Sequence, residues 1–240
     1  MSGVPNASAD PGGVPALDRL AGRLVDATSA LRVAVATTPA ERDAAFRLRY
    51  EQVVSQGWRS PDDLPAGVEH DAYDAEALHV GAWDDHALVG TIRLVLPAAG
   101  RRLPVEADFD LDIAPVGATV EVGRLVVAPA YRGDPAHRAW GALLGRAWLL
   151  TRARGFAVLA GAASARMVEQ MRALGLPFEV LGAARQHWGQ ERHPVRLDPA
   201  HGTPRWFGGP EGAPDRPEPG APPAVRAPPA PPAVRGPSAR

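Results

Sequence analysis

Polar and apolar residues alternate in several short runs of this chain, and longer amphipathic stretches lie between them. Alternation with a period of two predicts half-buried strands, and apolar residues three or four apart predict helices. The predicted strands cover residues 31–37, 77–83, 88–96, 119–127, 156–161, 178–181 and 193–197. The predicted helices cover residues 16–30, 39–56, 135–154 and 164–174, and residues 98–118 are expected to be mostly loop.

Residues that start and stop helices support several of these boundaries. Thr38-Pro39-Ala40-Glu41 is a capping box with proline at the first helical position, and Gly57 supplies the stop. Asp134 followed by Pro135 is a second helix-start signal. Asp84-Asp85-His86 separates two alternating runs and predicts a hairpin.

The order of these elements predicts an α/β (α+β) fold, in which a mixed sheet carries helices on both faces. We expect one domain at residues 16–207. Residues 1–15 and 208–240 are rich in proline, glycine and alanine and are expected to be disordered tails, because they bury too little apolar surface. The second tail repeats Pro-Pro-Ala-Val-Arg and is either a solvated linker or a polyproline docking peptide.

Composition narrows the function classes. The chain has 240 residues, of which 45% are hydrophobic, and its net charge is −1, with no basic stripe of the kind that binds nucleic acid. It contains neither cysteine nor lysine, which excludes disulfides, a cysteine nucleophile and Schiff-base chemistry. No signal peptide and no apolar run of about 18 residues are present, so we expect a cytoplasmic protein without a membrane span. The bias toward alanine, arginine, glycine and proline is typical of a GC-rich bacterial genome.

Two acidic clusters lie at strand entrances, each near an arginine. Glu69-x-Asp71-x-x-Asp74 precedes the run that contains Arg93, and Glu121-x-x-Arg124 begins another run. Strand alternation points Glu121 and Arg124 to opposite faces, unless a bulge at Gly123 re-aims one of them. These charges are either ordinary solvated loop and strand ends or the lining of a polar cleft. We expect no metal site, because no second ligand cluster with a diagnostic spacing accompanies the acidic loop.

Three further positions leave two interpretations open. Arg49 borders the apolar face of its helix and is either a core-edge side chain or a ligand contact. Arg93 lies inside an apolar strand, where a guanidinium needs a carboxylate or a ligand. Trp58 is either a packing lid or a ligand platform. Tyr131-Arg132-Gly133-Asp134-Pro135 joins a strand to a helix and could hold one phosphate.

As a set, these residues resemble the acyl-homoserine-lactone synthases and the N-acyl amino acid synthases, two branches of the Gcn5-related N-acyltransferase (GNAT) fold. The resemblance covers residues 31–181. It rests on Arg49 with Trp58, Glu69-x-Asp71-x-x-Asp74, Gly90-Thr91-Ile92-Arg93-Leu94 and Glu121-x-x-Arg124. It implies a mixed, mostly antiparallel sheet with a splayed central strand pair.

The chain departs from this pattern at two places. Val53 stands where the lactone synthases usually carry an aromatic residue, which leaves the use of S-adenosylmethionine open. Asp134-Pro135-Ala136-His137 stands where acetyl-CoA enzymes carry a glycine-rich loop, which favours a carrier-protein thioester over ordinary acetyl-CoA use.

The resemblance implies direct attack of an amine on a thioester, and the absence of cysteine agrees, since no acyl-cysteine can form. Glu121 is the first candidate base and Glu69 the second. Arg124 and Arg93 would clamp a carboxylate of the amine substrate. The other substrate-binding candidates are Arg49, Trp58, Asp71 and Asp74, of which the aspartates would orient the arginines or bind the ammonium group.

The resemblance also implies where the donor thioester lies. A backbone amide near Val126 or Val127 would meet the oxyanion, and Arg132 and Gly133 would contact the pantetheine arm. The acyl chain would lie against Trp140, Leu144, Met167, Met171 and Phe178, although core packing would explain the same residues. No tightly bound cofactor is expected, and the co-substrate is an acyl carrier protein or coenzyme A thioester.

The function expected on this basis is N-acyl transfer to the amine of a small amino-acid-like compound. Two alternatives stay open: an acetyl-CoA-dependent N-acetyltransferase of the same fold, and a non-catalytic domain that binds an acyl carrier. The identity of the amine and the length of the acyl chain are not specified by the sequence.

Overall fold

A computed structural model of the chain describes residues 13–28, 30–132, 138–173, 176 and 178–201. The expected tails lie mostly outside these ranges, and so do Gly133 and the predicted helix start at Asp134 and Pro135. The first helix begins at Gly13, three residues before its predicted start.

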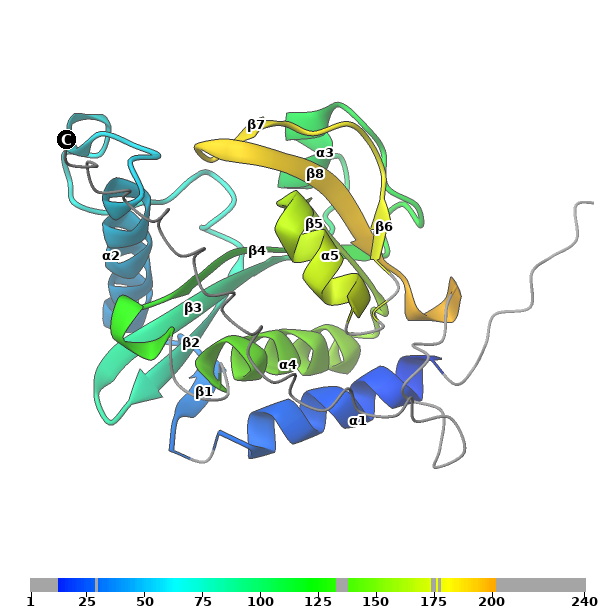
Figure 1. The fold of residues 1–240 in the computed structure, drawn as a ribbon, viewed down its shortest axis with the longest axis horizontal. Coiled ribbons are helices and arrows are strands. Elements are labelled where there is room, and N and C mark those ends of the chain that lie inside the picture. Colours follow the sequence, from blue (N-terminus) through cyan, green and yellow to red (C-terminus); the bar gives the residue numbers. More distant parts are fainter. Residues whose placement is uncertain (1–12, 29, 133–137, 174–175, 177, 202–240) are drawn as a thin grey trace, which may run out of the picture.

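The described residues form an α/β structure built on one large sheet (Figure 1). Its strands are β1 (Arg32–Val35), β2 (Leu78–Asp84), β3 (Ala87–Val95), β4 (Thr119–Val127), β5 (Val158–Ala163), β6 (Phe178–Val180), β7 (Arg185–His187) and β8 (Gln190–Leu197). They are arranged in the order β1-β2-β3-β4-β5-β8-β6, and β7 pairs with β8. β4 and β5 are parallel, and the other pairs are antiparallel. The predicted mixed, mostly antiparallel sheet is confirmed.

Helices cover both faces of this sheet. They are α1 (Gly13–Asp26), α2 (Pro39–Ser55), α3 (Pro104–Phe109), α4 (Arg138–Ala153) and α5 (Ala165–Ala173). Ile92 and Leu94 of β3 pack in one core cluster with Leu143 of α4. Arg93, between them in sequence, points to the opposite face, where α2 lies. α1 packs against α4, on the face of the sheet that α4 covers (Figure 1).

The N-terminus of α2 has the predicted cap. The Thr38 hydroxyl accepts a hydrogen bond from the Glu41 amide at 3.2 Å, and the Glu41 carboxylate accepts one from the Thr38 amide at 3.2 Å. The helix ends at Ser55, and Gly57 then adopts a φ of +67°, which glycine tolerates best. This fixed helix presents Arg49 to the sheet.

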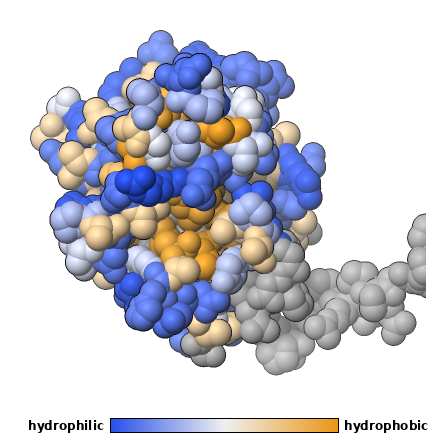
Figure 2. Space-filling model, turned by 90° about the vertical axis from the view of Figure 1, so that its left-hand side faces the viewer, coloured by the Kyte–Doolittle hydropathy of each residue, from blue (hydrophilic) through white to orange (hydrophobic). Residues whose placement is uncertain are grey.

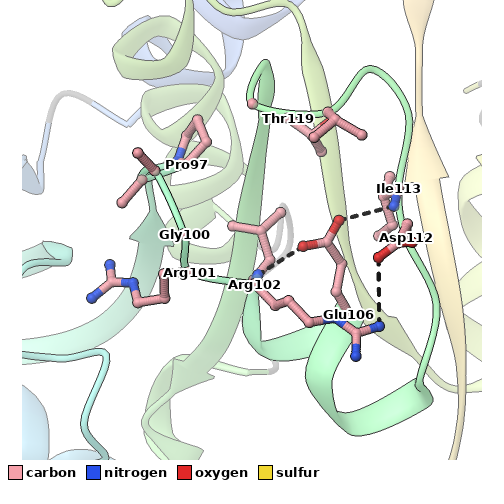
Figure 3. Close-up of a pocket in the computed structure, with 13 residues that line it drawn as sticks. Pro97, Gly100, Arg101, Arg102, Glu106, Asp112, Ile113 and Thr119 are labelled. Atoms are coloured by element: carbon pink, nitrogen blue, oxygen red, sulfur yellow. Dashed lines mark hydrogen bonds and ion pairs between the residues drawn. The ribbon is translucent and has the colours of Figure 1, made fainter.

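Residues 98–118, predicted to be mostly loop, contain the short helix α3. Pro104 at the first helical position was an available start signal, but the N-cap residue, Leu103, has no side-chain acceptor. The Glu106 carboxylate substitutes for one, because it accepts hydrogen bonds from the Leu103 amide at 2.8 Å and from the Ile113 amide at 2.9 Å. Figure 3 shows Glu106 between these segments, with Arg102 paired to Asp112, at a cavity of about 630 Å³.

β4 and β5 separate after a short paired stretch. They pair from Thr119 with Val158 to Glu121 with Ala160, and both strands continue beyond these residues without pairing to one another. The splayed central pair is therefore confirmed.

A bulge in β4 coincides with this split. Arg93 of β3 opposes Gly123, but Thr91 opposes Val126, so one extra residue lies on β4 between these two pairs. Within the bulge Arg124 has a φ of +53°, in the left-handed region that non-glycine residues rarely adopt. The bulge lies next to Gly123, where the sequence suggested one, and it turns Arg124 toward the α2 face.

Gly161 allows the two strands to approach at the start of the split. A Cβ atom there would lie 2.5 Å from the Val122 carbonyl oxygen, which is backbone and moves only with its strand. We expect Gly161→Ala to lower the free energy of unfolding by about 1–3 kcal/mol, measured by urea denaturation. Gly182→Ala is the matched control, because its nearest neighbour would be a Pro194 side-chain atom at 3.4 Å. Equal denaturation midpoints for the two variants would contradict the inferred steric role.

Candidate active site

Six charged side chains form a closed ring on the α2 face of the sheet, in which arginines and carboxylates alternate. Around the ring the order is Arg49, Glu69, Arg124, Asp71, Arg93 and Asp74. Three guanidiniums thus face three carboxylates, and the formal charges cancel.

Arg49 and Asp74 form the tightest pair of the ring. Arg49 donates to the two Asp74 carboxylate oxygens at 2.9 and 3.0 Å, and its Nε donates to Glu69. This is the bidentate geometry that guanidinium and carboxylate groups favour. Burial alone would raise the pKa of Asp74, but the hydrogen bonds from Arg49 and the charge of Arg93 hold it well below its usual value.

Arg93 and Arg124 close the ring from neighbouring strands. Arg93 donates to Asp71 at 2.7 Å and to Asp74 at 3.0 Å. Arg124 donates to Asp71 at 2.8 Å and to Glu69 at 3.4 Å. Burial lowers the pKa of Arg124 to about 10, although Glu69 opposes this shift, so the guanidinium is charged at neutral pH.

Exposure divides the ring into two parts. The side chains of Arg49 and Arg93 are each 1% exposed, whereas those of Arg124 and Asp71 are 13% and 28% exposed. The burial of Arg49 and Arg93 is at odds with the predicted direct contact to a substrate, because their guanidiniums are enclosed by protein. Through their hydrogen bonds these two guanidiniums hold Glu69, Asp71 and Asp74 in place.

Glu121 lies on the same face but outside the ring. It is buried, and one carboxylate oxygen accepts a hydrogen bond from the Val105 amide at 2.7 Å. Burial raises the pKa of Glu121 to about 8, against the opposing effects of that hydrogen bond and of the charges of Arg93 and Arg124. Among the described residues Glu121 and Arg124 form no ion pair. The other Glu121 oxygen lies 3.7 Å from where a Cβ of Gly123 would stand.

A cavity of about 460 Å³, here called the split cavity, passes through the sheet where β4 and β5 separate. On the ring side it is lined by Arg124 and Trp58, and on the opposite side by side chains of α4 and α1. The five residues predicted to contact an acyl chain all line it: Trp140, Leu144, Met167, Met171 and Phe178. The split cavity therefore connects the charged ring to an apolar interior. Figure 2 shows apolar side chains gathered at the centre of one face of the molecule and bordered by polar ones.

The β7–β8 hairpin adds an aromatic residue that the sequence reading missed. Trp188 lies over the Arg124 guanidinium, with 3.6 Å between the guanidinium carbon and the ring centroid. Trp188 and Gly189, at φ of +53° and +72°, form a two-residue turn between His187 and Gln190, and Gly189 packs against Trp58. Gly189 was the available signal, because two-residue hairpin turns require positive φ, which glycine adopts readily.

The predicted donor-binding residues lie at the end of β4. Val126 and Val127 oppose Thr91 and Gly90 of β3, beyond the part of β4 that lines the split cavity, Val122 to Leu125. The exposed residue Arg132 donates to the Val127 carbonyl at 2.8 Å and to Gln52. Gly133 is outside the described residues.

Two negative findings concern the described part of the chain. No group of three or more histidine or acidic side chains there is arranged to hold a metal ion. No helix there has the length and apolar character that crossing a membrane requires.

Comparisons with known proteins agree with the fold described above. Residues 48–141 match the family model described as an acetyltransferase (GNAT) domain, and among curated proteins none matches at a significant level.

Solved structures with this fold include TofI in a ternary complex with an inhibitor and MTA (25% identity, TM-score 0.56, 70% of this chain and 91% of that one). They also include MesI, a CoA-dependent acyl-homoserine lactone synthase (25% identity, TM-score 0.57, 70% of this chain and 89% of that one). FeeM, an N-acyl amino acid synthase from uncultured soil microbes, is similar in fold (18% identity, TM-score 0.54, 71% of this chain and 92% of that one). The chain is therefore an acyltransferase of the GNAT fold that resembles the acyl-homoserine lactone synthases and the N-acyl amino acid synthases.

Proposed function

We propose that this acyltransferase moves an acyl group from a thioester of an acyl carrier protein or of coenzyme A to the amine of a small amino-acid-like compound. The observation that carries the proposal is the course of the split cavity. It has an apolar lining through the sheet and reaches the charged ring at Arg124.

The apolar part of the split cavity suits an acyl chain. Its volume of about 460 Å³ lies in the range of roughly 300–1,000 Å³ that is common for small-molecule sites. Met167 and Met171 in its wall have flexible side chains that adapt to chains of different length. An acetyl group alone would leave most of this volume unfilled.

The two partly exposed members of the ring, Arg124 and Asp71, suit an amino acid. Within the described residues Arg124 uses Nε and Nη2 in its ring hydrogen bonds, which leaves Nη1 to bind a substrate carboxylate. Asp71 is the partly exposed carboxylate beside it and can hold the ammonium group. The other four charges of the ring hold Arg124 and Asp71 in place, and the Trp188 ring packs against the Arg124 guanidinium.

The chemistry then needs a base and a donor to the oxyanion. Once the ammonium group has lost one proton to water, the neutral amine nitrogen attacks the thioester carbonyl carbon, a C–N bond forms and the C–S bond breaks. The second amine proton passes by way of Glu121 to the leaving thiolate, which departs as the thiol and leaves the amide. Glu121 in its carboxylate form accepts the amine proton past Gly123, directly or through water. Since Ala128 donates to the Val89 carbonyl, strand alternation points the Val127 amide away from β3, toward the split, where it can meet the oxyanion.

Replacement of Arg124 by alanine tests the amine site. We expect kcat/KM for the amine to fall by roughly 10–100-fold, because a charge-assisted hydrogen bond to the substrate carboxylate is lost. Purified protein would be given octanoyl carrier protein, octanoyl-CoA or acetyl-CoA with a panel of amino acids, and the products read by mass spectrometry. Extracts of cells that overexpress the protein would identify the natural product.

Arg102→Ala is the matched control, since Arg102 forms exposed ion pairs at the other cavity (Figure 3). Folded wild-type protein that forms no acyl amide from any donor would overturn the proposal. A normal rate in Arg124→Ala would remove Arg124 from the site. Transfer from acetyl-CoA alone would favour the second candidate, an N-acetyltransferase, for which the match to an acetyltransferase domain speaks.

A further inference from the structure

The helix α1 contributes a wall to the split cavity although it precedes the first strand of the sheet. Its apolar residues Leu17, Leu20, Ala21 and Leu24 line the cavity. Leu17 and Ala21 are buried, whereas Leu20 and Leu24 are only half-buried. Half-buried leucines that line a cavity are available for contact with a ligand.

Close packing fixes α1 against α4. A Cβ atom at Gly145 of α4 would lie 2.7 Å from the Ala21 carbonyl oxygen and 3.2 Å from Leu24, so glycine is what allows this approach. Trp148 of α4 donates its indole N–H to the Asp18 carboxylate at 2.7 Å. Arg152 pairs with the same carboxylate at 3.3 Å. α1 is therefore held in register by both apolar and polar contacts.

α1 and the charged ring lie at opposite ends of the split cavity. The charged ring lies on the α2 face of the sheet, and α1 packs on α4 at the opposite face (Figure 1). A ligand that enters the split cavity with its reactive end beside Arg124 therefore points its far end toward α1.

We propose that α1 is the floor of the acyl site and that Leu20 sets the longest acyl chain the enzyme accepts. The inference rests on the proposed function, since it takes the split cavity as the acyl site. Leu20 is the chosen position because Leu24 packs against Gly141 and Gly145, whereas no Leu20 atom is among those nearest to either glycine. A larger side chain at position 20 shortens the space for the chain, and a smaller one lengthens it.

The experiment measures binding of free fatty acids to the full chain by calorimetry, with octanoate, dodecanoate and hexadecanoate as probes. Leu20→Phe should weaken the binding of the longest fatty acid that the wild type binds by roughly tenfold and leave the affinity for octanoate unchanged. Leu20→Ala should increase the affinity for a longer fatty acid. Arg19→Phe is the matched control, because it adds the same ring to the exposed side of α1. Thermal unfolding of each variant confirms that it is folded.

The outcomes separate this inference from the proposed function. A change in the longest fatty acid bound by the Leu20 variants, with no such change in Arg19→Phe, supports α1 as the floor of the acyl site. Fatty-acid binding with the same length limit in every variant overturns the role of α1 and leaves the acyltransferase proposal intact. Absence of fatty-acid binding in the wild type overturns the floor and also the acyl site on which it rests. Fatty-acid binding without any acyl transfer in the separate assay would count against the proposed function alone.

Discussion

Glu121→Gln should lower acyl transfer by roughly 10²–10⁴-fold while the protein stays folded. Glutamine fills the same space and can still accept the Val105 amide hydrogen bond, but it cannot take a proton from the amine. Single-turnover rates with the acyl thioester and a saturating amine would measure the loss. Unchanged single-turnover rates would exclude Glu121 as the base and move that role to Glu69, whose carboxylate is held by Arg49 and Arg124.

The pH dependence provides a second readout for Glu121. Burial raises its pKa to about 8, so only about a tenth of the wild-type protein carries the carboxylate form at pH 7. Wild-type kcat should therefore rise with pH until it levels off above about 8. The residual activity of Glu121→Gln should lack this rise. A wild-type profile that is flat between pH 6 and pH 9 would contradict this role.

The protonation of Glu121 should affect folding stability in the opposite sense, because stability falls over the pH range in which activity rises. The folded pKa, about 8, lies above the ordinary value of 4.5, so the folded state holds the proton more tightly across this window. Stability of the wild type should therefore fall as pH rises from about 4.5 to about 8. Glu121→Gln removes this loss and should be more stable than the wild type at pH 9, by at most about 5 kcal/mol. Loss of activity combined with this gain in stability would separate catalysis from folding.

Much of the fold follows from local signals in the sequence. The capping box at Thr38 and Glu41 places α2, and the period-two runs place the strands that form the centre of the sheet. The need for a bulge near Gly123 could also be inferred, because strand alternation alone would keep Glu121 and Arg124 on opposite faces. These features depend on a few neighbouring residues, which is why the sequence shows them.

The ring itself could not be derived from local signals. Its members come from α2, the acidic loop, β3 and β4, and the contacts join residues as far apart as Glu69 and Arg124. The sequence left open whether Arg49, Arg93 and Asp74 contact a ligand or other protein groups, and the fold encloses them and pairs them with one another. Whether a charged side chain meets a substrate or another side chain depends on burial, and burial is a property of the assembled fold.

Two parts of the site were missed for related reasons. Trp188 reaches Arg124 because the β7–β8 hairpin folds back over the site, and this contact spans more than sixty residues of sequence, from 124 to 188. α1 has the pattern of an ordinary amphipathic helix, yet three of its leucines, Leu17, Leu20 and Leu24, line a cavity. Periodicity identifies an apolar face but does not say what that face covers.

Arg49→Met should destabilise the protein by about 3–5 kcal/mol, the second large effect we expect. The substitution leaves Glu69 and Asp74 buried beside one another with one guanidinium fewer between them, and chemical denaturation would measure the loss. Arg47→Met is the matched control on the same helix, since Arg47 pairs with Asp43 in solvent, where both side chains are at least half exposed. That variant should stay within about 0.5 kcal/mol of the wild type.

The pH dependence of this deficit distinguishes unpaired charge from lost packing. In the wild type, the lowered pKa of Asp74 contributes stability that is present above its ordinary value of 3.8 and is lost as pH falls toward the folded value. In Arg49→Met the Asp74 carboxylate loses the hydrogen bonds that lower its pKa and becomes easier to protonate, so acid neutralises its charge. The gap between variant and wild type should therefore narrow as pH falls from 7 toward about 4. A gap that stays constant over this range would mean that Arg49 acts through the packing of its aliphatic stem, and the ring would then not be held together by its charges.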